Sequence, residues 1–323
     1  MSEPELIVRF TAEDAARELR ADVREGLTEQ PKWLSPKWFY DAAGSELFER
    51  ITTLPEYYQT RAEQQILQRT AMDIAEITGA ATLVELGSGS SEKTRLLLDA
   101  LRKHGTLHRF VPLDVSGSAL RAAVDAIALD YPELLVRGVV DDFTSGLTAL
   151  DAGTDRLVAF LGGTIGNLLP AERAGFFASV RAALRPGEWL LLGTDLVKDP
   201  ERLVRAYDDA SGVTAEFNRN VLRVLNRELG ADFAVEEFGH VALWNAEQEW
   251  IEMRLRAARP MRVELAELAL TAELAAGEEI RTEISAKFRR ERVHDELTAA
   301  GFDLRHWWLD DAGDFALSLA VAR

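Results

Sequence analysis

The spacing of apolar residues changes along the chain. Residues 12–27 carry apolar side chains at helical intervals, and a second helix is expected over about 60–78. Between these helices, the segment 36–67 is dense in aromatic residues and is interrupted by Pro55. From residue 81 the apolar residues come instead in short runs, several of which end in glycine. Such runs are typical of buried strands, so helices at the N-terminal end are expected to give way to a sheet.

The central part of the chain alternates between short apolar runs and helical stretches. The expected strands are 81–86, 109–113, 134–140, 157–161 and 189–193. The expected helices between them are 91–103, 116–129 and 171–184. Strands that alternate with helices form right-handed βαβ units, which build a parallel sheet covered on both faces. The pattern therefore predicts an α/β fold.

The last third of the chain returns first to helices and then to strands. Asp199 and Pro200 form a good N-cap and N1 pair for a helix to about 211. The further expected elements are a helix over 213–228, strand-like pieces at 240–259, 261–270 and 280–288, and a helix over 291–300. The runs FDLRHWWLDD and FALSLAVA, joined by residues 311–314, predict a terminal hairpin.

These elements suggest two domains that are each built from separated pieces. Residues 61–196 and 288–323 are expected to form the domain with the parallel sheet. Residues 1–60 and 197–287 are expected to form a smaller α+β domain.

Composition excludes several kinds of site and partner. The formal net charge of −17 disfavours nucleic acids and anionic membrane surfaces, and its simplest meaning is solubility. The chain has no cysteine, so disulfides, thiolate nucleophiles and zinc–thiolate sites are excluded. His104 and His108 have helical spacing, but Gly105 between them indicates a helix end, and no metal is expected. The first residues are polar and acidic, so no signal peptide is expected, and no apolar stretch approaches bilayer-spanning length. We expect a cytoplasmic monomer.

The segment VELGSGSSEKTR (84–95) lies where the first strand of the sheet turns into a helix. Gly87 and Gly89 permit a tight turn and a close approach of a ligand to the backbone. A dinucleotide fold would carry a third glycine where Glu92 stands, and a phosphate loop would need GxxxxGK[ST]. The segment therefore argues against a pyrophosphate and leaves open a different nucleotide-type ligand or a simple turn.

Two acidic residues follow the next two strands. Asp114 could accept the hydroxyl groups of a ribose, and Asp142 could accept an adenine amino hydrogen. Ligands of open α/β sheets bind at these carboxyl ends of the strands. Each carboxylate could instead cap a helix or a turn. Both being caps behind a glycine loop is the less favoured interpretation.

The glycine loop, the two acids and the terminal hairpin together resemble the Rossmann-like methyltransferases that use S-adenosylmethionine (SAM). That resemblance implies a SAM methyltransferase sheet with a C-terminal antiparallel hairpin, plus a smaller substrate-binding domain. It implies SAM as the co-substrate. The residues it assigns to SAM are Gly87, Ser88, Lys93, Asp114, Asp142 and Phe143.

A closer resemblance covers the chain from residue 35 to its end. The segments PKWFYDAAGSELFERIT, LPEYYQTR, LVELGSGSSEKTR, FLGGTIGNL, LLLGTDLVKD, RAYDDASGVTAEFNRNVL and GEEIRTEISAKF are similar to the histidine Nα-methyltransferases of ergothioneine biosynthesis. The resemblance implies three methyl transfers from SAM to the α-amine of free L-histidine, which give hercynine. The residues it assigns to histidine are Tyr40, Tyr57, Gly162, Thr164, Asn167, Tyr207, Met253, Glu283 and Ser285.

The residue types agree with these assignments but leave alternatives. Asn167 offers both a donor and an acceptor, although it could be a turn asparagine. Tyr207 follows apolar residues at helical spacing, which by itself favours core packing, although its hydroxyl could still reach a ligand. Strand alternation places Glu283, Ser285 and Lys287 on one face, which could equally be a solvated one. A buried Glu283 carboxylate would select an imidazole over an apolar side chain.

No side chain in the sequence is an evident general base. We expect Asn167, Thr164 and Tyr40 to position the substrate amine, and aromatic faces such as that of Tyr57 to stabilise the methylated ammonium. Two alternatives remain open. One is a methyltransferase of the same fold that acts on another amino acid or amine, and the other is a SAM-binding protein without catalysis.

Overall fold

The chain forms two compact units. A computed structural model describes residues 4–89, 91, 93–142 and 153–323. Unit 1 comprises Met1–Thr11, Gln59–Val197 and Lys287–Arg323, and unit 2 comprises Ala12–Tyr58 and Lys198–Ala286. Each unit has its own cluster of buried apolar side chains.

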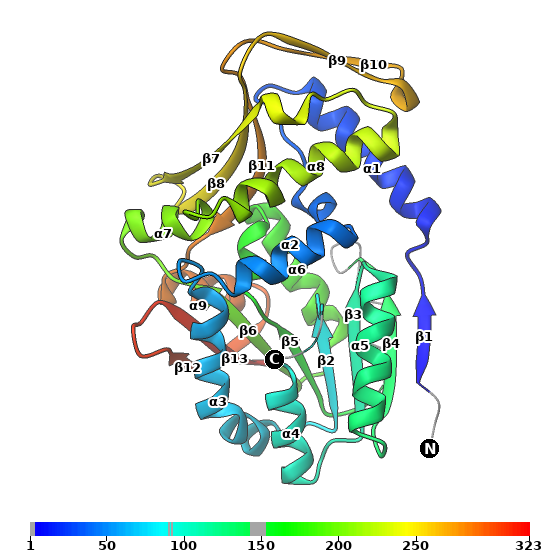
Figure 1. Cartoon of the computed structure of the whole chain (residues 1–323). Coiled ribbons are helices and arrows are strands. Elements are labelled where there is room, and N and C mark those ends of the chain that lie inside the picture. The colour runs from blue at the N-terminus through cyan, green and yellow to red at the C-terminus, as the bar shows by residue number, and fades with distance from the viewer. Residues whose placement is uncertain (1–3, 90, 92, 143–152) are drawn as a thin grey trace. The chain divides into compact units, whose positions relative to one another are not determined.

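Unit 1 is built around one sheet (Figure 1). Its strands, in the described residues, are β1 (Glu5–Val8), β2 (Thr82–Leu86), β3 (Arg109–Asp114), β4 (Leu135–Val140), β5 (Arg156–Phe160), β6 (Trp189–Asp195), β12 (Phe302–Leu309) and β13 (Phe315–Ala322). They lie in the order β1-β4-β3-β2-β5-β6-β13-β12. β1 to β6 pair in parallel, whereas β13 pairs antiparallel with both β6 and β12.

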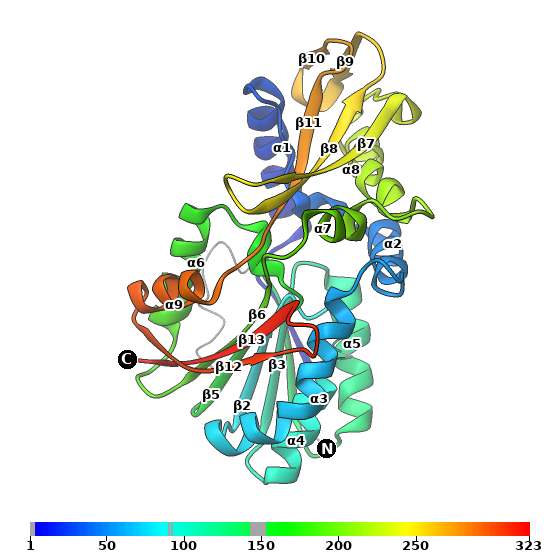
Figure 2. The same cartoon turned by 90° about the vertical axis from the view of Figure 1, so that its left-hand side faces the viewer.

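Helices cover both faces of this sheet. They are α3 (Gln59–Thr78), α4 (Arg95–His104), α5 (Gly117–Asp130), α6 (Pro170–Ala183) and α9 (Arg290–Ala299). Figure 2 shows α3, α4 and α5 on one face and α6 and α9 on the other. Because both faces are covered, β2 and β5 are buried at every position, which explains why their sequences are mainly apolar and do not alternate between apolar and polar residues.

Unit 2 combines helices with two small antiparallel sheets. Its helices are α1 (Ala12–Thr28), α2 (Ala42–Thr52), α7 (Pro200–Tyr207) and α8 (Val213–Leu229), with short 3-10 turns η1 (Pro36–Phe39), η4 (Val235–Glu237) and η5 (Ala266–Leu268). Its strands are β7 (Phe238–Asn245), β8 (Trp250–Ala257), β9 (Met261–Leu265), β10 (Leu270–Leu274) and β11 (Glu279–Ala286). The sheets have the orders β11-β8-β7 and β10-β9, and α8 packs against β7 and β8.

The expected α/β fold with a C-terminal antiparallel hairpin is confirmed, with local differences. The sequence pattern missed β1, which pairs in parallel with β4 and lies in unit 1, not with the smaller domain. The helix expected over 91–103 begins only at Arg95, because Ser91 has a positive φ of 54° and a turn precedes the helix. The helix expected to reach about 211 ends at Tyr207.

Two strand-like pieces fold back as hairpins instead of running straight. The piece 240–259 divides into β7 and β8, and the piece 261–270 contains β9, η5 and the start of β10. Across the described residues, no helix has the length and apolar character needed to cross a membrane.

Candidate active site

The glycine loop lies at the carboxyl end of β2, where the strand order reverses between β3 and β5. Gly87 and Gly89 have positive φ angles of 68° and 49°, which glycine adopts without steric cost. The backbone N–H groups of Gly87 and Ser88 donate to the carbonyl of Leu113, at 2.8 and 3.2 Å. The loop is therefore held against the end of β3, at the position where open α/β sheets bind ligands.

Asp114 joins the end of β3 to the glycine loop. Its carboxylate accepts the N–H groups of Gly89 (3.0 Å) and Ser116 (2.9 Å). Burial raises the pKa of Asp114, although these two N–H groups favour its ionised form. A carboxylate oxygen has more than one lone pair, so Asp114 can also accept hydroxyl groups of a ligand.

Asp142 follows β4 and is buried. The adjoining backbone N–H of Asp141 donates to the carbonyl of Asp114 at 3.2 Å, so the ends of β3 and β4 lie side by side here. The predicted residues Gly87, Asp114 and Asp142 thus share one edge of the sheet. Phe143 lies outside the described residues.

The hydroxyl of Ser88 is buried and has no hydrogen-bond partner within the described part of the chain. A buried polar group without a partner is costly, and a polar ligand would remove that cost. Together with the two positive-φ glycines and the Asp114 carboxylate, this hydroxyl fits the polar groups of SAM.

Two buried carboxylates that the sequence analysis did not single out lie beside this loop. Glu85 in β2 accepts hydrogen bonds from Ser91 (3.0 Å) and from Thr94. Burial raises the pKa of Glu85 to about 7, although these hydroxyl groups oppose that change. Glu63 in α3 forms an ion pair with Lys93. An acidic residue inside an apolar run is the signal that could have identified Glu85.

The segment FLGGTIGNL connects β5 to α6. Gly162 and Gly163 have positive φ angles of 78° and 71°, and the hydroxyl of Thr164 donates to the carbonyl of Leu161 at 3.1 Å. Asn167 ends the 3-10 turn η3 (Thr164–Asn167) and is half-buried. Its amide makes no hydrogen bond within the described residues, so both its donor and its acceptor remain available to a ligand.

In unit 2, Tyr207 and Ser285 contact each other directly. Their hydroxyl groups are 2.7 Å apart, and both residues are buried. Tyr207 is therefore more than a core residue. Its ring packs in the core, and its hydroxyl forms a hydrogen bond.

Aromatic rings connect the other predicted tyrosines to Tyr207. The rings of Tyr57 and Tyr207 have centroids 6.4 Å apart at a steep angle. Phe48 contacts both Tyr57 (6.2 Å) and Tyr40 (5.5 Å), and Phe217 contacts Tyr40 at 5.4 Å. Tyr40, Tyr57 and Tyr207 thus belong to one aromatic cluster with Phe48 and Phe217.

Glu283 lies two residues before Ser285 on β11, and its cross-strand neighbour on β8 is the buried Met253. The register shifts between Arg281 and Glu283, and Glu283 itself is half-buried. Lys287 does not continue this strand face. It lies beyond the end of β11, in unit 1, where it is fully buried in an ion pair with Asp195 at 2.8 Å.

A buried polar network of His240, Asn218 and Thr282 connects Tyr207 to β11. His240 contacts the carbonyl of Tyr207 through Nε2 (2.8 Å) and the amide nitrogen of Asn218 through Nδ1 (2.8 Å). The hydroxyl of Thr282 donates to the side-chain carbonyl of Asn218 at 2.6 Å. Burial lowers the pKa of His240, so the ring is neutral, accepts at Nδ1 and donates from Nε2.

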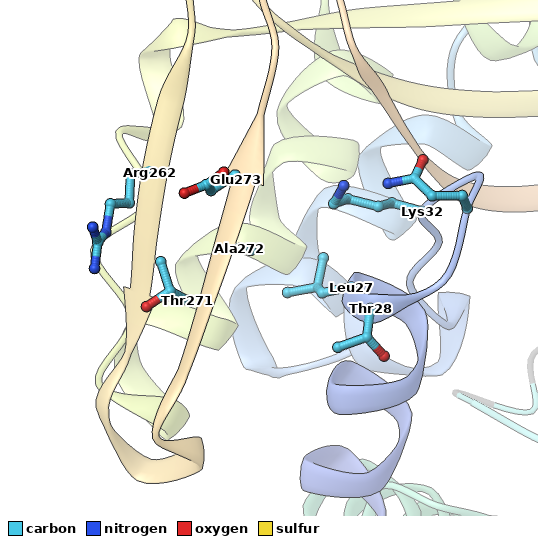
Figure 3. A pocket seen from close by; sticks show the side chains of 8 residues that line it. Leu27, Thr28, Lys32, Arg262, Thr271, Ala272 and Glu273 are labelled. Carbon is cyan, nitrogen blue, oxygen red and sulfur yellow. The ribbon is translucent and has the colours of Figure 1, made fainter.

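A separate pocket of about 470 Å³ lies in unit 2 (Figure 3). It is lined by Leu27, Thr28, Gln30, Lys32, Arg262, Thr271, Ala272 and Glu273. The first four come from α1 and the segment after it, and the others come from the β9–β10 hairpin. None of the predicted site residues lines this pocket.

The predicted residues thus form two groups. The described residues assigned to SAM lie in unit 1, together with Gly162, Thr164 and Asn167. The other residues assigned to binding the substrate histidine lie in unit 2. A parallel sheet with β13 inserted antiparallel between β6 and β12, together with a glycine loop and Asp114 at the carboxyl ends, is the arrangement of Rossmann-like SAM-dependent methyltransferases.

Comparison with known proteins identifies the family. Residues 19–322 match the histidine-specific, SAM-dependent methyltransferases, and the chain belongs to that family. It is 58% identical to the histidine N-alpha-methyltransferase of Mycolicibacterium smegmatis, over 97% of both chains. It is 56% identical to that of Mycobacterium tuberculosis, over 98% of both chains. Ergothioneine biosynthesis protein 1 of Neurospora crassa is 34% identical over 64% of this chain and 24% of its own.

Proposed function

We propose that this protein transfers methyl groups from SAM to the α-amine of free L-histidine, three times in succession, to give hercynine for ergothioneine biosynthesis. The observation that carries the proposal is the match to histidine Nα-methyltransferases over nearly the whole chain, which includes both units. SAM is the methyl donor of this family.

In the proposed reaction, unit 1 holds the methyl donor. Asp114 accepts the ribose hydroxyls, Asp142 and Phe143 hold the adenine, and Gly87, Ser88 and Lys93 bind the remaining polar groups. The orphaned Ser88 hydroxyl and the Asp114 carboxylate at the loop support this assignment. The sulfonium methyl group needs little activation, so the residues of the chain act mainly by positioning.

In the same proposal, unit 2 selects histidine. Glu283 accepts the imidazole N–H, while the paired hydroxyls of Tyr207 and Ser285 bond the ring nearby, and Met253 packs against it. An apolar side chain offers no N–H group to the Glu283 carboxylate, and a site built to hydrogen-bond an N–H discriminates strongly against a ligand that lacks it. Tyr40 and Tyr57 border the ligand with aromatic surface.

The substrate amine must be neutral when it attacks, but free amino acids are mostly protonated at neutral pH. We propose that the deprotonated amine is captured, or loses its proton through water, near Asn167, Thr164 and Tyr40. The free amide of Asn167 supports this assignment. The rate with subsaturating histidine should rise with pH toward the amine pKa, and a flat profile would count against capture.

The remaining assignments complete the proposal. Residues 61–196 and 288–323 serve as the SAM-binding domain, and residues 1–60 and 197–287 serve as the substrate-binding domain. The protein acts as a cytoplasmic monomer without a metal, and it binds neither nucleic acid nor membranes. The formal charge of −17 supports the last two points.

Mass spectrometry of histidine incubated with the protein and SAM tests the function. We expect products that carry one, two and finally three added methyl groups. A panel of amino acids with labelled SAM then separates histidine from other amines. Preferred methylation of another amine would replace the substrate assignment, and failure to consume SAM with any amine would refute the enzymatic function.

Two variants test the site residues. D114N should weaken SAM binding with little change in the Michaelis constant (KM) for histidine. E283Q should raise the KM for histidine with little change in SAM binding, since it removes the charged acceptor proposed for the imidazole. If E283Q left the KM for histidine unchanged, the role of Glu283 would be wrong even if the protein proved to be a histidine methyltransferase.

A further inference from the structure

Glu63 is a carboxylate with no solvent exposure that lies beside the glycine loop. It belongs to α3, one turn before the buried Ile66 and Leu67, and therefore lies on the apolar face of that helix. An ionised carboxylate at such a position is costly unless its oxygens are paired and hydrogen-bonded. Its partners therefore indicate why the chain keeps an acid there.

The two oxygens of Glu63 contact two different loops. Oε2 forms the ion pair with Lys93, which follows the glycine loop. Oε1 accepts the backbone N–H of Gly162 at 2.7 Å, in the FLGGTIGNL segment. One side chain thus connects the loop assigned to SAM with the loop assigned to histidine, and both loops lie in unit 1.

The strand beside Glu63 leaves space for this carboxylate. A Cβ atom at Gly193 in β6 would lie 2.2 Å from Oε1, closer than any two such atoms can approach. A side chain at residue 193 would therefore displace the Glu63 carboxylate from this position. Gly162 itself adopts a positive φ of 78°, so its N–H is held in a turn that favours glycine.

We infer that Glu63 is a positioning residue that holds Lys93 and the Gly162 turn in one hydrogen-bonded group, and so couples the geometry of the methyl-donor loop to that of the substrate loop. This inference rests on the proposed function. Glu63 fixes the direction of the Lys93 ammonium toward SAM, and it fixes the backbone that leads to Thr164 and Asn167.

Glutamine at position 63 separates the two contacts. In E63Q the amide oxygen can still accept the Gly162 N–H, but the neutral side chain no longer pairs with Lys93. We expect the SAM dissociation constant, measured by calorimetry without turnover, to rise about tenfold, as expected for loss of a charged hydrogen bond. The KM for histidine should stay within about twofold of wild type.

E63A removes both contacts. It should weaken SAM binding as E63Q does, and it should also raise the KM for histidine about tenfold, because the Gly162 turn loses its acceptor. If E63A does not fold, E63Q still decides whether the Glu63 charge holds Lys93 for SAM binding, since its side chain has nearly the same shape as that of glutamate.

E188Q is the matched control. Glu188 is also a buried glutamate, and its carboxylate pairs with Arg156 at 2.9 Å, at the opposite ends of β5 and β6 from the glycine loop. The E188Q variant should have a lower melting temperature than wild type, with unchanged SAM binding. The inference is overturned if E63Q binds SAM as wild type does, or if E188Q weakens SAM binding as much as E63Q.

The calorimetric readout separates this inference from the proposed function. If the wild-type protein binds SAM but methylates no histidine, the proposed function fails. The SAM dissociation constants of wild type and E63Q can still be compared, so the role of Glu63 in SAM binding is still tested. If the wild type methylates histidine and E63Q behaves like E188Q, the function stands and the role of Glu63 is refuted.

Discussion

At the scale of single residues, Glu85 makes stability depend on pH. Its pKa is about 7 in the folded chain, compared with an ordinary value near 4.5. Between these two values the folded state holds a proton that the unfolded state has released, so the free energy of unfolding falls as pH rises from about 4.5 to 7. The full change for this one group is on the order of 3 kcal/mol.

The variant E85Q isolates that contribution. Urea unfolding of wild type and E85Q at pH 5 and pH 8 should show the variant gaining stability relative to wild type at the higher pH. E188Q serves as the control, because the hydrogen bonds from Arg156 hold the pKa of Glu188 below its usual range in spite of burial. Its difference from wild type should be constant between pH 5 and 8. An equally constant difference for E85Q would refute the raised pKa.

Tyr57 supports a second prediction at this scale. Its ring lies in the aromatic cluster with Phe48 and Tyr207, and an aromatic face attracts a substituted ammonium by about 0.5–2 kcal/mol. Y57L should therefore slow the second and third methylations more than Y57F does, measured as the accumulation of mono- and dimethylated histidine. Equal accumulation in the two variants would show that the ring face does not contribute.

The sequence predicted where the glycine loop and Asp114 lie, because both follow directly from short patterns at strand ends, and their contact with SAM stays a prediction. It did not predict Glu63, whose partners Lys93 and Gly162 lie 30 and 99 residues away. No local period indicates which loop a helical carboxylate meets. Such a contact depends on how α3 packs against the sheet, which a single sequence does not reveal.

At the scale of elements, the regular periods were predicted well and the turns were not. β2, β3 and α8 differ from their expected ranges by one residue at most at either end. The β7–β8 hairpin was missed because its turn has neither glycine nor proline. Instead, the side chain of Asn245 accepts the N–H groups of Glu247 (3.2 Å) and Gln248 (3.1 Å) to close it.

The polar network that connects Tyr207 to β11 links α7, α8, β7, β8 and β11. Thr282 is the member of this network that can be substituted by a residue of similar shape. Its hydroxyl donates to Asn218 and lies 3.1 Å from the carbonyl of Met253. T282V keeps the shape but leaves the amide oxygen of Asn218 unpaired, which should cost about 1–3 kcal/mol of stability. Because the network also supports Tyr207 and the strand of Glu283, the KM for histidine should rise.

Thr271 offers the matched control for T282V. It also lies on a strand, β10, but is exposed, so T271V should change stability by less than about 0.5 kcal/mol. Chemical denaturation gives the stabilities, and initial rates give the KM values for both substrates. If T282V lost stability but kept the KM for histidine, the network would support the fold alone.

At the scale of the whole molecule, the sequence predicted that each unit is discontinuous. The change of period near residue 61 and the return to the sheet near 288 marked the main divisions. The assignment of β1 to unit 1 escaped notice because four residues are too few to establish a period. Its pairing with β4 spans more than a hundred residues, so only the folded chain reveals it.

The discontinuity predicts which pieces can fold. The core of unit 2 contains buried residues from its first piece, among them Leu19, Val23 and Phe39. Each contributes roughly 1.5–3 kcal/mol by burial, against a typical net stability of about 5–15 kcal/mol for a whole domain. The backbone of the first piece also pairs with β11, through the N–H of Leu34 and the carbonyl of Arg281 at 2.8 Å.

Residues 198–286 alone should therefore remain unfolded, because they lack part of their core and a backbone partner for β11. The same residues joined to residues 12–58 by a flexible linker should fold cooperatively, as measured by circular dichroism and denaturant unfolding. Carrying V23D in the joined fragment supplies the control, since a charge at this fully buried position should abolish folding again. Cooperative folding of 198–286 alone would show that the first piece only covers a core that the second completes by itself.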